Sequence, residues 1–360
     1  MNKNNDRRLV VNARHFPILK LLFILHTALL FTPALVKCQG KDSIQLYISK
    51  AVALFQKESL YSENINWKKM QDSLTLLSAK MTSYKQADEV LIWVFSKLKD
   101  KHGFISTKDT SYKYKEPVVD RLSAGIKEEY TKPRSIKISM LTTETGYYKM
   151  PAVLIGSDKL RMKEWANKLR DSLCKLLSYH PKGLIIDLRM NNGGNSAPML
   201  EAFKIILGDA YKIYYADKNL VLSDPAKNED TAAASYRKCA VPDNNCNFFS
   251  GTPLAVLIGP ATASSGEILA MALASRPDTK LFGEPTSGNC NSTNGFRTGI
   301  NSFYALLTVS YVADHRKKIN KQSVVVPDVY VKSDDNYNNL NDDITVRAAQ
   351  DWLKINYGLR

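Results

Sequence analysis

The segment that decides the fold is "PLAVLIGPATASSGEILAMALASR", residues 253–276. It begins with a short apolar run of the kind that forms a buried strand, and it ends with the apolar spacing of a helix. The turn between them, Thr262–Glu267, reads "TASSGE" and contains the S-x-x-E pattern of a capping box, so Ser264 is predicted to cap the helix. Because the N-terminus of a helix carries partial positive charge, a hydroxyl at this position is also suited to nucleophilic attack.

The sequence on both sides of this segment alternates in the same way. Before it, residues 161–180 have the spacing of an amphipathic helix, and "GLIIDLR" (183–189) is a short apolar run. After it, "FYALLTVSYVAD" (303–314) alternates as a strand does, and residues 342–358 read as a final helix. Strands that alternate with helices predict an α/β fold.

The N-terminal part has a different texture. Residues 41–105 contain three charged stretches with apolar residues three and four positions apart, which predict a small helical module. We expect Ser62 or Asn64 to cap the middle helix. Residues 106–145, rich in Lys, Thr and Tyr, show no clear period and are interpreted as a connecting region, so that the α/β core occupies residues 146–360.

Residues 1–40 predict a secretory signal peptide, since basic residues precede the apolar run "FPILKLLFILHTALLFTPALV" and small residues lie near its end. A retained membrane anchor is the alternative, but Lys20, His26 and a proline interrupt the apolar run and disfavour a stable span. A lipoprotein attached at Cys38 is a third interpretation, disfavoured by Lys37 directly before it. The favoured interpretation is a periplasmic or secreted protein with no stable membrane span after signal removal.

Charge and motif content exclude several classes of protein. The formal charge of the 360-residue chain, +15, falls to +10 without the predicted signal peptide, which carries six Lys or Arg and one Asp. The other basic residues are spread along the chain apart from "DHRKK" (314–318), so nucleic-acid binding is not predicted. There is no phosphate-binding loop, dinucleotide fingerprint or zinc motif, and neither a metal nor another cofactor is predicted. In an oxidising compartment, Cys239 and Cys246 are predicted to close a small disulfide loop.

A hydroxyl nucleophile needs a base, commonly His. The mature chain keeps three histidines, of which His180 ends a helix and His315 lies in the basic cluster. His102, in "KLKDKHGF", lies in a loop just beyond a helix, where a fold can aim it at a cleft. A surface position is the alternative for a loop histidine, and the residues alone leave both interpretations open.

The nucleophile also needs donors for an oxyanion, and "DLRMNNGGN" (187–195) is the candidate segment. A buried strand runs into two consecutive glycines, which accept positive φ and let backbone N–H groups approach a ligand closely. Asp187 and Arg189 are expected to pair and hold this loop. An ordinary turn is the alternative, because Asn-Gly is a common turn signal.

Taken together, "GYYKMPAV", "GLIIDLRMNNGGNSAPML", "PLAVLIGPATASSGE", "KLFGEPTSG" and "VVVPDVYV" resemble the tail-specific, or C-terminal processing, serine protease family, which also includes the tricorn core and retinoid-binding-protein-like domains. The pieces follow the family order over residues 146–331, and "LKDKHGF" is similar to the family's upstream His motif. The resemblance implies a crotonase-like α/β protease core with Ser264 as the nucleophile. It also implies an oxyanion hole formed by the N–H of Ser265 and that of Gly193 or Gly194.

The sequence departs from the family pattern at the base. Many bacterial members use a Ser/Lys dyad, but Asn289 stands at the Lys position here, and a neutral amide cannot act as a base. The resemblance therefore implies the His-using branch, with His102 as the general base. No acidic residue lies in "KINKQSVVV", near which that branch places a carboxylate, so Asp314 is the expected orienting residue, with Glu267 and Asp100 as weaker candidates.

The sequence thus predicts a serine endopeptidase that hydrolyses protein or peptide substrates through an acyl-enzyme at Ser264. The family's frequent PDZ module is not expected, because only 43 residues separate His102 from "GYYKMP". The alternative on the same fold is a non-catalytic protein that binds an apolar ligand or a peptide. A fatty-acyl hydratase of related fold is disfavoured, since no carboxylate pair is found in an oxyanion-loop context. No oligomeric state follows from the sequence.

Overall fold

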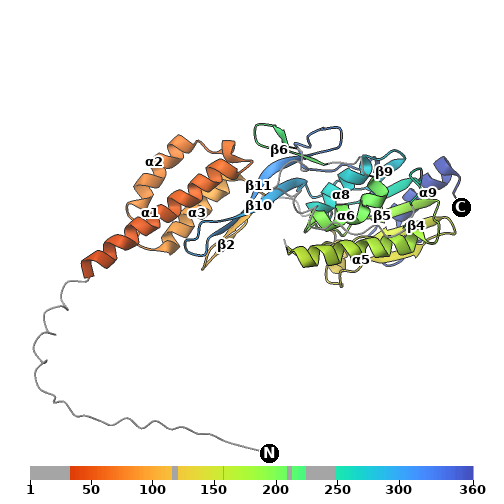
Figure 1. The fold of residues 1–360 in the computed structure, drawn as a ribbon, viewed down its shortest axis with the longest axis horizontal. Coiled ribbons are helices and arrows are strands. Elements are labelled where there is room, and N and C mark those ends of the chain that lie inside the picture. Colours follow the sequence, from red (N-terminus) through yellow and green to blue (C-terminus); the bar gives the residue numbers. More distant parts are fainter. Residues whose placement is uncertain are drawn as a thin grey trace, which may run out of the picture.

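The computed structural model describes residues 33–115, 121–156, 158–208, 213–223, 246 and 248–359. A bundle of helices lies at one end of the molecule and a larger α/β body at the other, with strands β10 (Asn291–Arg297) and β11 (Tyr304–Ala313) between them (Figure 1). Residues 1–32 of the predicted signal peptide lie outside the described residues. Helix α1 (Pro33–Glu58) begins inside the predicted segment 1–40.

The α/β body is built on a six-stranded sheet in the order β12-β9-β8-β5-β4-β3. In chain order its strands are β3 (Lys137–Met140), β4 (Thr145–Lys149), β5 (Gly183–Asp187), β8 (Leu254–Ile258), β9 (Thr279–Gly283) and β12 (Val329–Tyr330). Neighbouring strands run parallel except β3 and β4, which pair antiparallel. The predicted α/β fold is confirmed.

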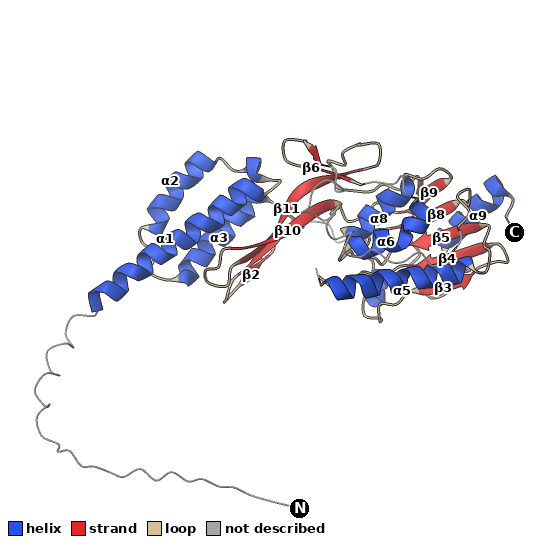
Figure 2. Ribbon diagram, in the orientation of Figure 1, coloured by secondary structure: helices blue, strands red, loops and turns tan. Residues whose placement is uncertain are grey.

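Helices cover both faces of this sheet (Figure 2). The helices are α5 (Lys159–Leu177), α6 (Ser196–Leu207) and α8 (Ser265–Ala274) on one face and α9 (Ile344–Tyr357) on the other. Strand β5 shows why its run is wholly apolar: Leu184 and Ile186 pack toward the first face, while Ile185 packs with Leu353 of α9. A parallel strand buried on both faces has no polar side to display.

The helical module consists of α1, α2 (Trp67–Ser78) and α3 (Tyr84–Leu98). The cap of α2 is Asn66, whose side-chain oxygen accepts the Lys69 N–H, so the predicted cap at Ser62 or Asn64 is wrong. Those two residues lie instead in a short 3-10 helix, η1 (Ser62–Asn64), and the extended backbone at Ile65 separates it from α2.

A second sheet joins the module to the body, in the order β2-β1-β11-β6-β7 with β10 also paired to β11. Its shorter strands are β1 (Phe104–Ser106), β2 (Ser111–Tyr112), β6 (Tyr214–Ala216) and β7 (Leu222–Ser223). Ala305 and Leu307 of β11 belong to the same buried core as Leu91 and Phe95 of α3. The helices and β11 are therefore packed as one unit, and the loop between α3 and β1 is held against β11.

The predicted connecting region contains regular elements. Besides β2 and β3 it includes α4 (Ala124–Glu129), whose cap Ser123 accepts the Ile126 N–H. A helix of six residues and a strand of four are too short to display a recognisable period. Asp335 of a later loop accepts hydrogen bonds from Ser123 and Gly125, so contacts distant in sequence position this helix.

The predicted pairing of Asp187 and Arg189 is confirmed and extended. Arg189 Nη2 lies 2.7 Å from Asp187 Oδ2 and 2.6 Å from Asp343 Oδ2, and all three side chains are buried. Asp343 also caps α9 by accepting the N–H groups of Thr345 and Val346. Because an uncompensated buried charge costs about 3–5 kcal/mol, this cluster fixes α9 against the end of β5.

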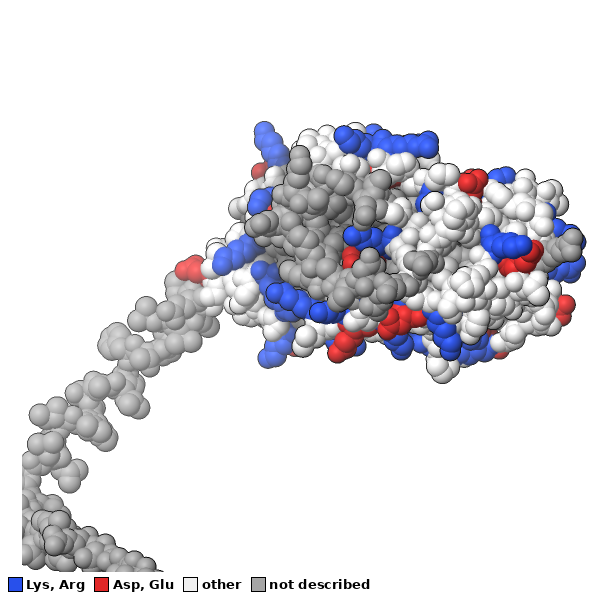
Figure 3. Space-filling model, turned by 45° about the vertical axis from the view of Figure 1, so that its right-hand side comes forward, with Lys and Arg blue, Asp and Glu red and all other residues white. Residues whose placement is uncertain are grey.

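Two features of the surface bear on the sequence predictions. In the part of the chain that the structure describes, no helix is both long enough and apolar enough to cross a membrane. Lys and Arg side chains lie in several separate places on the face shown in Figure 3, in line with their spread along the sequence.

The disulfide differs from the one predicted. Cys246 is bonded to Cys174 of α5, with a Cα–Cα distance of 5.3 Å, so the predicted Cys239–Cys246 pairing is wrong; Cys239 lies outside the described residues. Sequence proximity favoured the nearer partner, whereas the packing of α5 brings together two cysteines that are 72 positions apart. The bond ties the segment before β8 to the outside of the body.

This assignment predicts a specific peptide pair. Non-reducing peptide mapping by mass spectrometry should recover the Cys174 and Cys246 peptides linked, and Cys239→Ser should leave that link unchanged. Cys174→Ser should lower the free energy of unfolding by about 2–4 kcal/mol in urea denaturation, because the closed loop is long. Recovery of a linked Cys239–Cys246 peptide would contradict the structure.

Candidate active site

Ser264 lies at the turn between β8 and α8, where it is the residue before the first helical turn. Its backbone has φ 52° and ψ −119°, a conformation that costs a residue other than glycine about 1–3 kcal/mol. The Glu267 carboxylate accepts the Ser264 N–H at 2.7 Å, as one half of a capping box. Ser264 is the N-cap residue of α8 and forms this capping box with Glu267, as the sequence predicts.

The glycine loop packs directly against this turn. Gly193 has φ +101°, and a Cβ added there would lie 2.7 Å from the Cβ of Ser264, so only glycine fits. Asn191 joins the two segments: its backbone oxygen accepts the Ala263 N–H at 3.0 Å, and its side-chain oxygen accepts the Gly193 N–H at 3.0 Å. A Cβ at Gly266 would lie 2.4 Å from that same backbone oxygen. The loop and the turn are therefore fixed relative to each other.

Two of the three predicted oxyanion donors have suitable N–H groups. The Ser265 N–H belongs to the first residue of α8 and has no partner within the helix. The Gly194 N–H makes no hydrogen bond to the residues that the structure describes, and the Ser265 hydroxyl donates to the Gly194 oxygen at 2.7 Å. The Gly193 N–H is already used by Asn191. The geometry thus favours Gly194 over Gly193 as the second donor.

Glu267 is fully buried, and its carboxylate collects hydrogen bonds from the segment that follows β9. Oε1 accepts the Thr286 hydroxyl at 2.5 Å and the Gly288 N–H at 2.9 Å. Oε2 accepts the Asn289 N–H at 2.9 Å, besides that of Ser264 at 2.7 Å. Burial raises the pKa of Glu267 to about 7, although these hydrogen bonds oppose the shift. Glu267 therefore positions the turn at Ser264 and does not contact His102.

His102 lies in the loop between α3 and β1, which is organised by Asp100. The fully buried Asp100 carboxylate accepts the N–H groups of His102 at 3.1 Å and Gly103 at 2.8 Å. It also accepts the Thr308 N–H at 2.9 Å and the Thr308 hydroxyl at 2.7 Å, which fixes the loop to β11. The acidic residue in "DKHG" thus shapes the backbone around His102 and does not bond its imidazole.

The partner of the His102 ring is Asn291, the first residue of β10. Nδ1 of His102 lies 2.5 Å from Asn291 Oδ1. The amide nitrogen of Asn291 faces the hydroxyls of Tyr61 at 3.2 Å and Ser323 at 3.4 Å, and its oxygen faces the histidine. In the tautomer with the proton on Nδ1, this contact is a hydrogen bond and Nε2 is the basic nitrogen.

Burial lowers the pKa of His102 below 6.5, while the hydrogen bond to Asn291 and the charge of Asp100 oppose this effect. The imidazole is consequently neutral at pH 7, the form in which it accepts a proton. A neutral amide as the orienting group leaves this lowered pKa in place, whereas a carboxylate would raise it.

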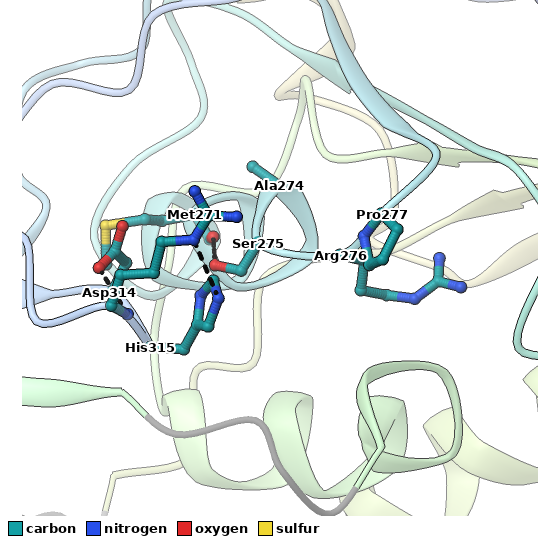
Figure 4. Close-up of a pocket in the computed structure, with 8 residues that line it drawn as sticks. Met271, Ala274, Ser275, Arg276, Pro277, Asp314 and His315 are labelled. Carbon is teal, nitrogen blue, oxygen red and sulfur yellow. Dashed lines mark hydrogen bonds between the residues drawn. The ribbon is translucent and has the colours of Figure 1, made fainter.

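Asp314 is not the orienting residue, so that prediction is wrong. It follows β11, and its Oδ1 accepts the backbone N–H groups of Arg316 and Lys318, both at 2.9 Å. Figure 4 shows Asp314 with His315 beside the C-terminal end of α8, in a hollow of about 450 Å³, whereas Ser264 lies at the other end of that helix. Sequence spacing alone does not reveal this position, because it depends on where β11 ends.

A continuous chain of contacts connects the two halves of the site. Ser264 and Asn289 donate their N–H groups to the same oxygen of Glu267. The Asn291 N–H in turn donates to the Asn289 oxygen at 2.8 Å, and the Asn291 side chain bonds His102. The segment that leads into β10 thus contacts both the serine turn and the histidine.

Asn291 was missed by the sequence reasoning because the search for an orienting group was limited to acidic residues. The arrangement Cys-His-Asn of papain-like proteases shows that an amide can take this part. A search that included Asn near "KLFGEPTSG" would have raised Asn291 as a candidate. In the described residues, no group of three or more His, Cys, Asp or Glu side chains is arranged to hold a metal ion.

The fold and the serine at the strand-to-helix turn place the chain in the class of serine-type peptidases. A model of Peptidase family S41 matches residues 144–331, and the chain belongs to that family. The suspected relation to C-terminal processing proteases is confirmed.

Individual relatives are similar over part of the chain. The chain is 28% identical over 176 residues to the nisin-resistance protein of Lactococcus lactis subsp. lactis, a match that covers 48% of this chain and 52% of the relative. It is 27% identical over 233 residues to the carboxy-terminal processing protease CtpA of Bacillus subtilis (strain 168), covering 61% and 46%. The chain thus spans about half the length of these curated relatives.

Two solved structures share the fold. A lipoprotein from Streptococcus agalactiae superposes with a TM-score of 0.62 at 20% identity, covering 87% of this chain and 97% of that one. The photosystem II D1 C-terminal processing protease superposes with a TM-score of 0.56 at 14% identity, covering 81% and 93%. The likeness extends beyond the matched core, since both alignments cover more than four fifths of this chain.

The dependence of the turn on Glu267 is testable with Glu267→Gln. Because every partner of the carboxylate is a donor, the amide NH₂ would face donors and leave groups unpaired, at a cost of about 1–3 kcal/mol per buried group. We expect a lower free energy of unfolding and slower reaction of Ser264 with a fluorophosphonate. Glu284→Gln is the matched control, since within the described residues the Glu284 carboxylate accepts a single hydrogen bond, from the Ser333 N–H. Equal behaviour of the two variants would contradict the positioning role.

Proposed function

We propose that the protein is a serine endopeptidase in which Ser264, His102 and Asn291 form the catalytic triad. The contact between His102 Nδ1 and Asn291 is the observation that carries this proposal, because it leaves Nε2 as the basic nitrogen of an oriented imidazole. The hydroxyl of Ser264, the N-cap residue of α8, supplies the nucleophile. The substrates are proteins or peptides, as befits the family.

The proposed reaction begins when His102 Nε2 takes the proton of the Ser264 hydroxyl as the oxygen attacks the peptide carbonyl. The N–H groups of Ser265 and Gly194 then stabilise the oxyanion, and loss of one such donor costs about 10²–10³ in turnover. The protonated His102 delivers its proton to the leaving amine. Water activated by the same imidazole hydrolyses the acyl-enzyme and restores the serine.

The location of the reaction is part of the proposal. The predicted signal peptide and the Cys174–Cys246 disulfide both favour an oxidising compartment outside the cytoplasm. The second candidate form is a lipoprotein attached through Cys38, since a protein described as a lipoprotein has a similar structure. A periplasmic or secreted enzyme therefore remains the favoured interpretation.

The triad is tested first by labelling with a fluorophosphonate probe, which reacts with activated serines. We expect labelling of the purified chain, none of Ser264→Ala, and a rate reduced by about 10²–10⁴ for His102→Asn, whose amide still reaches Asn291 but is not a base. His180→Asn, a change at an exposed histidine, should label normally. A folded wild-type protein that does not label would favour the ligand-binding interpretation instead.

The neutral orienting group gives a second prediction, for pH dependence. Because the pKa of His102 is lowered by burial, the acidic limb of the rate of labelling should have its midpoint below pH 6.5. Asn291→Asp places a negative charge beside Nδ1 and should shift this midpoint upward by about 1–3 pH units. The hydroxyls of Tyr61 and Ser323 can turn to donate to the new carboxylate. An unchanged midpoint would show that residue 291 does not contact the reacting histidine.

A further inference from the structure

A second hollow lies beside the candidate active site, with a volume of about 340 Å³. It lies at the edge of the main sheet where the parallel strands β4 and β5 end, the edge from which the glycine loop and the Ser264 turn also emerge. Lys149 ends β4, and Lys137 begins the antiparallel β3 directly opposite it. Ligands of open α/β sheets bind at this edge.

Hydrogen bonds connect the walls of the hollow to the catalytic segments. Pro151 forms one wall, and its oxygen accepts the side-chain amide of Asn191 at 3.2 Å, the residue that also holds Gly193 and Ala263. Tyr130 forms another wall, and its hydroxyl donates at 3.3 Å to the oxygen of Ala261, three residues before Ser264. A group bound in the hollow is thus adjacent to the segments that present Ser264 and the oxyanion donors.

The hollow has an excess of positive charge. Four cationic side chains line it, from Lys132, Arg134, Lys137 and Lys149, with Glu129 as the one carboxylate among the lining residues. Glu129 lies 2.7 Å from Lys149 Nζ and 2.9 Å from Lys132 Nζ, and Lys132 Nζ also lies 3.3 Å from Glu128, so these two cations are matched by two carboxylates. Arg134 and Lys137 are exposed and make no hydrogen bond or ion pair with the residues that the structure describes. The positive charges of Arg134 and Lys137 therefore remain uncompensated by the residues that the structure describes.

We infer that this hollow is a substrate subsite that binds a carboxylate carried by the peptide, from an Asp or Glu side chain near the scissile bond. The volume accommodates such a side chain, and Arg134 with Lys137 supplies charge-assisted donors for it. Tyr130 and Met190 provide the apolar wall against which its methylene groups pack. A basic side chain is disfavoured in the same place, since it would add to the excess of cations.

This inference rests on the proposed peptidase function. Measuring peptide binding without cleavage tests the subsite separately from the peptidase activity. Ser264→Ala keeps the subsite but cannot react, so the affinity of labelled peptides can be measured by fluorescence anisotropy without cleavage. The probes are pairs of C-terminally amidated decapeptides of Gly, Ser and Ala that differ only by Glu or Gln at one position, with that position moved along the chain. We expect one position at which the Glu peptide binds about tenfold or more tightly, an advantage that falls as salt is raised.

The charge-reversal variant Arg134→Glu/Lys137→Glu, made in the Ser264→Ala background, should abolish the preference for Glu. Lys163→Glu/Lys280→Glu is the matched control, because it changes the net charge equally at exposed lysines outside the hollow and should retain the preference. Circular dichroism checks that both variants are folded. Equal affinity for Glu and Gln peptides at every position, or an unchanged preference in the charge-reversal variant, overturns the inference.

Peptides with a free C-terminus identify the source of the carboxylate. Preference for a free over an amidated terminus, with no preference for internal Glu, would assign the hollow to a chain end and overturn the side-chain assignment. Failure of the wild-type chain to react with a fluorophosphonate would contradict the peptidase proposal, whereas equal binding of Glu and Gln peptides by Ser264→Ala would contradict the subsite alone.

Discussion

The buried carboxylate of Glu267 is the group on which the geometry of the candidate site depends. A carboxylate removed from water is costly unless donors surround it. The donors here come from Ser264 on one side and from residues 286–289 on the other. Satisfying this one charge therefore holds the serine turn in its strained conformation and packs the segment that leads into β10 beside it.

The second constraint is that the proposed base comes from a different core. His102 is carried by the helical module, which packs on β11, while Ser264 belongs to the main sheet. Asp100 fixes the histidine loop to Thr308 of β11, and Asn291 completes the connection from the neighbouring strand β10. Because the proposed nucleophile and the proposed base stand on separately packed units, the second sheet between them is the element that aligns the candidate site (Figure 1).

The choice of an amide as the orienting group has an electrostatic consequence. The imidazole of His102 is partly buried, and with a neutral neighbour its pKa stays below the ordinary value, which keeps it in the basic form at neutral pH. In the proposed reaction, the amide lacks the charge stabilisation that a carboxylate would provide to the imidazolium of His102. Asp100, close to the ring but bonded to the backbone, provides a part of that stabilisation at longer range.

The sequence by itself determined the elements whose signals are local. The apolar run of β8, the small turn residues and the helix spacing of α8 placed Ser264 correctly at a strand-to-helix turn, and consecutive glycines marked the loop that packs on it. Local pattern also identified the α/β core and the helical module, because burial of one face or of both leaves a period in the sequence. The resemblance carried by the matched segments supplied the family.

Only the tertiary structure decided which residues meet across those elements. The pairing of β10 and β11 brings Asn291 to His102 and places Asp314 outside the candidate site. The packing of α5 brings Cys174 to Cys246. Such contacts join residues that are 72 to 189 positions apart, and a single sequence contains no periodic signal for them. The physical reason is that a buried polar group bonds to the partner that the packed backbone brings within hydrogen-bond distance. The residue type of the group does not by itself identify that partner.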